Sequence, residues 1–128
     1  MKKLKDIIVE RLHINKDIKS YNYHPKDKSE LKELIDKLIK ERGNEADLND
    51  IDTSEIKDMD SLFHKSEFNG DISKWDVINV KDMNGMFRES KFNGDISNWH
   101  VSNVKVKDMS LMFYDSPLEK NPPKWYKE

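Results

Sequence analysis

Four histidines, at positions 13, 24, 64 and 100, are the side chains of this sequence best suited to acid–base chemistry or metal binding. No two of them lie three to five residues apart, so the spacing with which paired histidines bind zinc is absent. The chain has no cysteine, which excludes disulfides, thiolate zinc sites and cysteine nucleophiles. The serine motif of hydrolases and glycine-rich phosphate loops are also missing. These absences predict a protein that is not an enzyme and holds no cofactor or metal.

Recurring aspartates are the second set of side chains that could do chemistry. Asp58, Asp82 and Asp108 each precede a methionine, and Asp71 and Asp95 each follow an Asn-Gly pair. A ladder of carboxylates can bind calcium, but no Asp-x-Asp-x-Asp-Gly loop with a closing glutamate occurs. An aspartate beside a turn or at the start of a helix more simply accepts hydrogen bonds from unpaired backbone N–H groups. We therefore predict that these aspartates have a structural role.

The aspartates belong to an internal repeat of 24 residues. The run Phe-Asn-Gly-Asp-Ile-Ser-x-Trp begins at Phe68 and recurs at Phe92. The last repeat is two residues longer because Lys105 and Val106 are inserted in it. The boundaries of the repeats fall at about 44–67, 68–91 and 92–117, followed by a closing fragment at 118–128. Self-similarity at such a period is typical of stacked repeat architectures.

Each repeat carries two patterns of apolar residues. Ile72 and Trp75 begin a series spaced by two and three residues, which predicts a short extended stretch. Met83 and Phe87 lie on one side of a helical turn, with Asp82 as its N-cap. The Asn-Gly pairs predict turns, because glycine tolerates positive φ and asparagine can bond its own backbone. In stacked units we expect one column of tryptophans and one of phenylalanines, formed by Trp75, Trp99 and Trp125 and by Phe63, Phe87 and Phe113.

A helix precedes the repeats. Apolar residues recur at i, i+3, i+4, i+7 and i+8 from Leu31, which predicts an amphipathic helix over 29–42. Asp27 and Glu30 have the spacing of a capping box, and Gly43 lies where a left-handed residue ends a helix.

The two ends of the chain differ in charge. Residues 1–43 hold 12 Lys and Arg against 8 Asp and Glu, whereas residues 44–128 hold 11 against 17. Apolar residues with helical spacing predict another helix over about 3–12, and a loose alternation predicts a strand over about 18–23. Together with the helix over 29–42 they would form a helix–strand–helix cap in residues 1–43. We therefore predict an α/β fold, a short leucine-rich-repeat-like solenoid of about three 24–26-residue strand–helix units in residues 44–128, covered by this cap.

The repeat also resembles a known family. The run Phe-Asn-Gly-Asp-Ile-Ser-x-Trp-Asp-Val-x-Asn-Val-x-Asp-Met-x-x-Met-Phe is similar to the BspA-like leucine-rich repeat, also called the Mycoplasma-lipoprotein DUF285 repeat, over about residues 44–125. The segment 23–31 resembles the leader that introduces such arrays. The resemblance implies an α/β solenoid used for protein–protein contact, often at cell surfaces, without catalysis. This chain has neither the secretion signal nor the lipobox cysteine of surface members, and no apolar run of about 20 residues that could span a membrane. We therefore expect a cytoplasmic location and no contact with a membrane.

Residues that break the repeat are the candidate partner contacts, because recognition usually lies in variation on a constant scaffold. Ile78 replaces a serine and His100 replaces an aspartate of the other units, and Lys105 belongs to the insertion. The full set of candidates is His64, Ile78, Arg88, Lys91, His100, Lys105 and Tyr126.

We expect a non-enzymatic protein–protein interaction module that binds a protein partner. A narrower hypothesis is a small phage or mobile-element protein that binds and inhibits a host protein. One alternative is contact with nucleic acid through the basic N-terminal segment, with its candidate residues at Lys16, Lys19, Tyr21, Tyr23 and Lys26. Another is a structural or assembly component of a virion or surface. The oligomeric state stays open.

Overall fold

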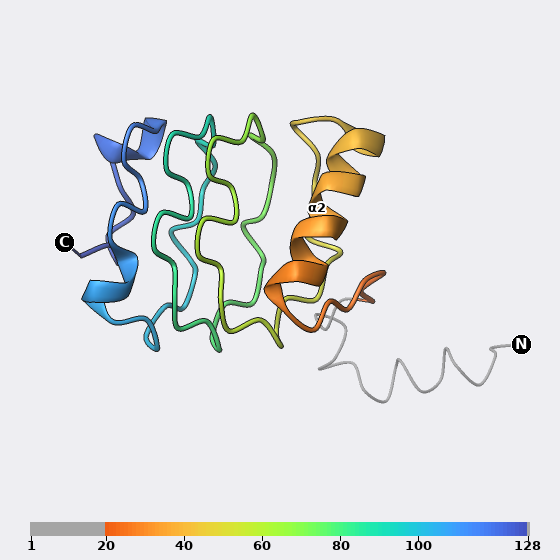
Figure 1. Ribbon diagram of the computed structural model, residues 1–128, viewed down its shortest axis with the longest axis horizontal. Coiled ribbons are helices and arrows are strands. Elements are labelled where there is room, and N and C mark those ends of the chain that lie inside the picture. Colours follow the sequence, from red (N-terminus) through yellow and green to blue (C-terminus); the bar gives the residue numbers. More distant parts are fainter. Residues whose placement is uncertain (1–19, 128) are drawn as a thin grey trace, which may run out of the picture.

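The computed structural model describes residues 20–127, which form a row of stacked coils between helix α2 at one end and the C-terminal segment at the other (Figure 1). Helix α2 spans Lys28–Arg42, and two short 3₁₀ helices, η2 and η3, span Val106–Met109 and Pro117–Glu119. These residues form no continuous β-strand. Their β structure consists of isolated parallel bridges, which join Tyr23 to Ile51, Asp47 to Asp71 and Asp58 to Asp82. The prediction of an α/β solenoid built from strand–helix units is therefore wrong.

The segment from Met83 to Ser90, predicted to begin as a helical turn, is a chain of consecutive turns. Gly85 and Glu89 have positive φ values of 61° and 57°. Each turn is closed by a hydrogen bond from a backbone N–H to the carbonyl three residues earlier, such as the bond from the Met86 N–H to the Met83 carbonyl at 3.2 Å. A residue with left-handed backbone conformation thus recurs every four residues, and this interrupts the right-handed conformation that a helix needs. The equivalent positions of the neighbouring repeats, Ser61, Lys65, Leu111 and Asp115, also have positive φ.

Alternate amides of this turn chain join neighbouring coils. The Met59 N–H donates to the Asp82 carbonyl at 2.8 Å, and the Phe63 N–H donates to the Met86 carbonyl at 2.8 Å. The same positions one repeat later donate to the last coil, for example from the Phe87 N–H to the Met112 carbonyl at 2.9 Å. These amides of the turn chain donate toward the C-terminal end of the stack, whereas the Asn69 and Asp71 N–H groups donate to the preceding coil.

Four of the recurring aspartates accept backbone N–H groups, but within turns and not at the start of a helix: Asp58, Asp71, Asp82 and Asp95. One carboxylate oxygen of Asp71 accepts the Ser73 N–H at 2.9 Å, and Asp95 accepts the Ser97 N–H at 2.9 Å. Asp82 likewise accepts the N–H two residues on, at 2.9 Å. Each such Asx turn bends the backbone. These bends explain why the extended stretches are too short to form strands.

The predicted aromatic columns are confirmed. Trp99 stacks between Trp75 and Trp125, with ring centroids 6.4 and 6.3 Å apart. Phe87 stacks between Phe63 and Phe113 at 5.5 and 5.7 Å. The indole N–H of each tryptophan donates to a backbone carbonyl of the preceding coil, at Leu48, Ile72 and Ile96. A third column, which was not predicted, joins Phe68 and Phe92 at 6.1 Å.

Glycine and asparagine in the Asn-Gly pairs at 69–70 and 93–94 have a different role from the one predicted. Gly70 and Gly94 are not among the glycines with positive φ. A Cβ on Gly70 would lie 2.0 Å from the Ala46 carbonyl oxygen, so glycine is needed there because two coils approach closely. Asn69 does not bond its own backbone; its side-chain oxygen accepts the N–H of Asn93 in the next coil at 2.8 Å.

Helix α2 confirms the predicted amphipathic helix. The Asp27 carboxylate accepts the Glu30 N–H at 2.9 Å, and Gly43 ends the helix with a φ of 95°. Leu31 and Ile35 are fully buried against the first coil. The rest of the predicted cap is described only in part. The helix over 3–12 lies outside the described residues, as does the start of the strand over 18–23, of which the described part forms only the bridge at Tyr23.

An ion pair ties the end of α2 to the first coil. Both terminal nitrogens of Arg42 donate to the Asp50 carboxylate at 2.9 Å, and the Asn22 amide donates to the same carboxylate at 2.8 Å. The hydrogen bonds from Arg42 lower the pKa of Asp50 to about 2. This bidentate geometry is the strong form of the Arg–carboxylate interaction.

We expect Asp50→Asn to destabilise the protein by about 1–2 kcal/mol at neutral pH, because the substitution removes the charge that Arg42 binds. The folded-state pKa of Asp50 lies below its ordinary value of 3.8, so its contribution is present above about pH 4 and is lost as the pH falls toward 2. Urea unfolding at neutral pH and between pH 4 and 2 measures both effects. Asp36→Asn is the control, because Asp36 forms an exposed pair with Lys32 worth less than about 0.5 kcal/mol. Equal losses in both variants would contradict the assignment.

Candidate interaction surface

Two of the predicted contacts, Ile78 and His100, line one groove on the side of the stack. Val106 lines the same groove, and buried Val101 and Val104 contribute to it. Ile78 is 39% exposed and Val106 is 49% exposed, which is unusual for aliphatic side chains of a repeat with a regular core. We call the surface formed by Ile78, His100 and Val106 the Ile78–Val106 face.

Departures from the repeat pattern place these side chains together. The Ile78 N–H is held by the Asp76 carboxylate at 3.1 Å, so the isoleucine occupies the turn position of a serine. Asn103 of the next coil donates its side-chain amide to the Ile78 carbonyl at 2.5 Å, which fixes the two coils against each other. The insertion forms η2, in which the Asp108 N–H donates to the Lys105 carbonyl at 2.8 Å, and Val106 is exposed on this turn.

Basic side chains border the Ile78–Val106 face. Lys127 also lines the groove. Lys105 and Lys107 flank Val106 in sequence and are exposed. The face therefore combines two exposed aliphatic side chains with bordering lysines, and one carboxylate, that of Asp76, lies 3.1 Å from the Ile78 nitrogen.

The structure places His64 and Arg88 in a different group, around Glu89. A carboxylate oxygen of Glu89 lies 3.9 Å from His64 Nε2 and 3.5 Å from Arg88 Nε. The Arg88 guanidinium also lies over the ring of Tyr114, 5.6 Å from its centroid. None of these residues lines the groove of the Ile78–Val106 face. Sequence reasoning missed Glu89 and Tyr114, because no periodic pattern distinguishes them from other surface residues.

The remaining predicted contacts are dispersed. Lys91 is exposed, and its N–H donates to the Ser66 carbonyl at 3.0 Å. Tyr126 is half-buried, with its ring edge-on to Phe113 at 4.9 Å. Tyr126 therefore serves mainly to close the end of the stack.

The residues predicted to contact nucleic acid do not form a basic stacking surface where they are described. Lys16 and Lys19 lie outside the described residues. Tyr23 packs against the core. Burial raises the pKa of Tyr21, and the charges of Asp52 and Asp76 raise it further. The cleft that Lys26 lines is also lined by two other lysines and by three acidic side chains, namely Lys28, Lys57, Asp27, Glu55 and Asp58.

Asp58, Asp60 and Asp82 bring carboxylate oxygens within 4.8 Å of one another. Burial raises the pKa of Asp82, and the charges of the neighbouring aspartates raise it further. The Lys28 ammonium lies 3.6 Å from the Asp58 carboxylate. Asp58 and Asp82 each accept the N–H two residues on, so turn formation accounts for this cluster.

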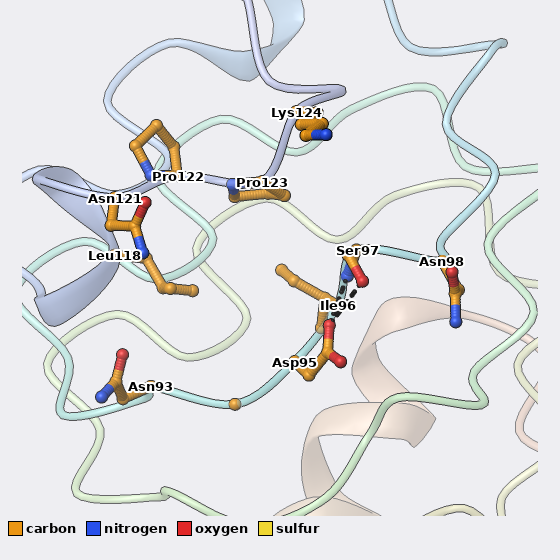
Figure 2. Close-up of a pocket in the computed structure, with 11 residues that line it drawn as sticks. Asn93, Asp95, Ile96, Ser97, Asn98, Leu118, Asn121, Pro122, Pro123 and Lys124 are labelled. Carbon is orange, nitrogen blue, oxygen red and sulfur yellow. Dashed lines mark hydrogen bonds between the residues drawn. The ribbon is translucent and has the colours of Figure 1, made fainter.

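A second groove lies at the C-terminal end of the stack, between the segment from Leu118 to Lys124 and residues 93–98 of the last coil (Figure 2). We call residues 93–98 the strip. The two prolines of this segment, Pro122 and Pro123, have no N–H to offer the strip. The indole of Trp125, just beyond them, bonds the Ile96 carbonyl at 2.8 Å. The last coil is therefore covered only in part by the closing segment.

Comparison with protein families matches residues 29–127 to the family described as Mycoplasma protein of unknown function, DUF285. No curated protein and no solved structure matches the chain. Within residues 20–127, no helix has the length and apolar character needed to cross a membrane. The cytoplasmic location stays a prediction.

Proposed function

The chain belongs to the DUF285 family, and we propose that it is a non-enzymatic module that binds a protein partner through the Ile78–Val106 face. The observation that carries the proposal is the convergence of Ile78, His100 and the inserted residue Val106 on one groove. A constant scaffold with local departures on one side is how repeat proteins usually build a binding surface.

The physical character of the face supports protein binding. Exposed Ile78 and Val106 would bury apolar area on association, and each could anchor a partner. The bordering lysines would steer the approach of the partner and make the association rate depend on the salt concentration. The proposal is confined to binding, because no contact among the described residues points to inhibition of a particular host protein.

Two alternatives have less support. The acidic side chains in the cleft of Lys26 balance its lysines in number, and the carboxylates near Tyr21 oppose the binding of a phosphate backbone. End-to-end assembly of copies would require the first coil of one stack to meet the last coil of another. Helix α2 covers the first coil, where Lys28 donates to the Asp60 carbonyl at 3.3 Å (Figure 1).

Affinity capture from a bacterial lysate tests the proposal. We compare the wild-type protein with Ile78→Ser/Val106→Ser, in which serine restores at position 78 the residue of Ser54 and Ser102. Leu111→Ser is the matched control, since Leu111 is as exposed as Val106, at 49%, and lies outside the groove.

We expect a protein that the wild type and Leu111→Ser retain and that the double variant loses, with at least about tenfold weaker binding. Failure of the wild type to retain any protein, or equal retention by all three, would contradict the proposal. Circular dichroism and unfolding of each variant confirm that the fold is unchanged.

A further inference from the structure

The chain contains three Asn-Gly pairs, at Asn69, Asn84 and Asn93. In such a pair the backbone nitrogen of glycine can attack the side-chain Cγ of asparagine, because glycine has no Cβ to hinder the approach. A new C–N bond closes a five-membered succinimide, and the side-chain amide leaves as ammonia. Water then opens the ring and yields aspartate or isoaspartate. The reaction needs no co-reactant besides water, so the local structure decides which pair reacts.

The structure holds the pair at Asn84 in place on both sides. The Asn84 side-chain oxygen accepts the Ser110 N–H at 2.8 Å. The attacking group itself is engaged, because the Gly85 N–H donates to the Ser110 carbonyl at 2.8 Å. Gly85 is also buried, which keeps water from the ring.

The pair at Asn69 is held by the coils on both sides of it. Its side-chain oxygen accepts the Asn93 N–H at 2.8 Å, and its own N–H donates to the Asn44 carbonyl at 2.7 Å. The Asp71 N–H, just beyond Gly70, donates to the Ala46 carbonyl at 2.9 Å. These bonds restrict both the side-chain rotation and the backbone motion that ring closure requires.

Asn93 has no further repeat to hold it. Among residues 20–127, no hydrogen bond engages the Asn93 side chain, whereas the Gly94 N–H, like the Gly70 N–H, is without an acceptor. Asn93 is exposed and lies on the strip that faces Asn121 and Pro122 across the open groove (Figure 2). Water can therefore reach the pair, and the side chain is free to rotate.

We propose that Asn93-Gly94 is a modification site at which this chain deamidates through a succinimide. The Gly94 nitrogen forms the bond to Asn93 Cγ and gives its proton to water. The bond from Cγ to Nδ2 breaks, and the amide group takes up a proton from water and leaves as ammonia. The product places a carboxylate in the groove two residues from Asp95, and the isoaspartate form adds one carbon to the backbone of the last coil. Both products change the open end of the stack.

The sequence contains its own control. Asn69 and Asn93 lie in the same local sequence, Phe-Asn-Gly-Asp-Ile-Ser, so a difference in their rates comes from the fold. The full chain is incubated at physiological temperature and mildly alkaline pH, and peptide mapping by mass spectrometry follows the conversion at each of the three sites. A parallel sample in concentrated urea gives the rates without the fold.

We expect Asn93 to convert about tenfold faster than Asn69 or Asn84 in the folded protein, the effect expected from the loss of one or two restraining hydrogen bonds. In urea, Asn69 and Asn93 should convert at equal rates. Asn93→Gln should abolish the fast phase without changing stability. Equal rates at Asn69 and Asn93 in the folded protein, or a faster reaction at Asn84, would overturn the proposal.

Discussion

Trp99→Ala is expected to lower the free energy of unfolding by about 3–5 kcal/mol, because it removes the central ring of the tryptophan column. Trp99 is 4% exposed and stacks on Trp75 with an angle of 4° between the ring planes. Its indole N–H also donates to the Ile72 carbonyl at 3.0 Å, and the substitution would remove this bond to the preceding coil. Urea unfolding measures the loss.

Two further variants separate the contributions at this site. Trp99→Phe keeps an aromatic ring in the column but removes the hydrogen bond to Ile72, and we expect it to cost about 1–3 kcal/mol. Tyr114→Ala removes a ring that is 48% exposed and should cost less than about 1 kcal/mol. Near-wild-type stability of Trp99→Ala would show that the stacked column does not hold the coils together.

Gly70→Ala is expected to have the second largest effect, a loss of about 3 kcal/mol or more from a single added methyl group. The new Cβ would lie 2.0 Å from the Ala46 carbonyl oxygen and 2.6 Å from the Phe68 ring. Ala46 is part of the neighbouring backbone, so a rotamer change cannot relieve the contact. The two coils would have to separate, and the Asp71 N–H would lose its bond to the same carbonyl at 2.9 Å.

Gly43→Ala is the matched control, because a Cβ on Gly43 would meet no atom within 4 Å. Its φ of 95° strains any other residue, so we expect a cost of about 1 kcal/mol. Thermal unfolding of both variants gives the comparison. An equal or smaller loss for Gly70→Ala than for Gly43→Ala would contradict the close approach of the coils.

The parts of the fold that could be predicted rest on spacing over whole repeats or whole helical turns. The tryptophans at 75, 99 and 125 recur at nearly constant intervals, so any stacking of the repeats places them in a column. Helix α2 was predictable because its apolar spacing and its terminal residues Asp27 and Gly43 agree.

The local structure of the repeats could not be predicted for a physical reason. Apolar residues at i, i+3 and i+4 face inward in a helical turn, and they also do so in the turn chain that the structure contains. The choice between them depends on positive φ at Ser61, Lys65 and Glu89, and none of these residue types indicates it. The requirement for glycine at position 70 comes from the backbone of another coil, which local sequence does not reveal.

The candidate site could be predicted at positions where a residue can be compared with the equivalent residues of the other repeats. Ile78 and His100 were identified as departures from the pattern, and the structure brings them into one groove. The insertion was identified through Lys105, although Val106 is the residue that lines the groove. The group around Glu89 depends on contacts between coils, and no comparison of repeats identifies it.

The affinity of the captured partner for three purified proteins tests the central claim most directly. Isothermal titration with the wild type, Ile78→Ser/Val106→Ser and Leu111→Ser gives three Kd values. We predict that the double variant binds at least about tenfold more weakly than the wild type, whereas Leu111→Ser binds as the wild type does. Equal Kd values for all three proteins, or an equal loss in Leu111→Ser, would contradict binding through the Ile78–Val106 face.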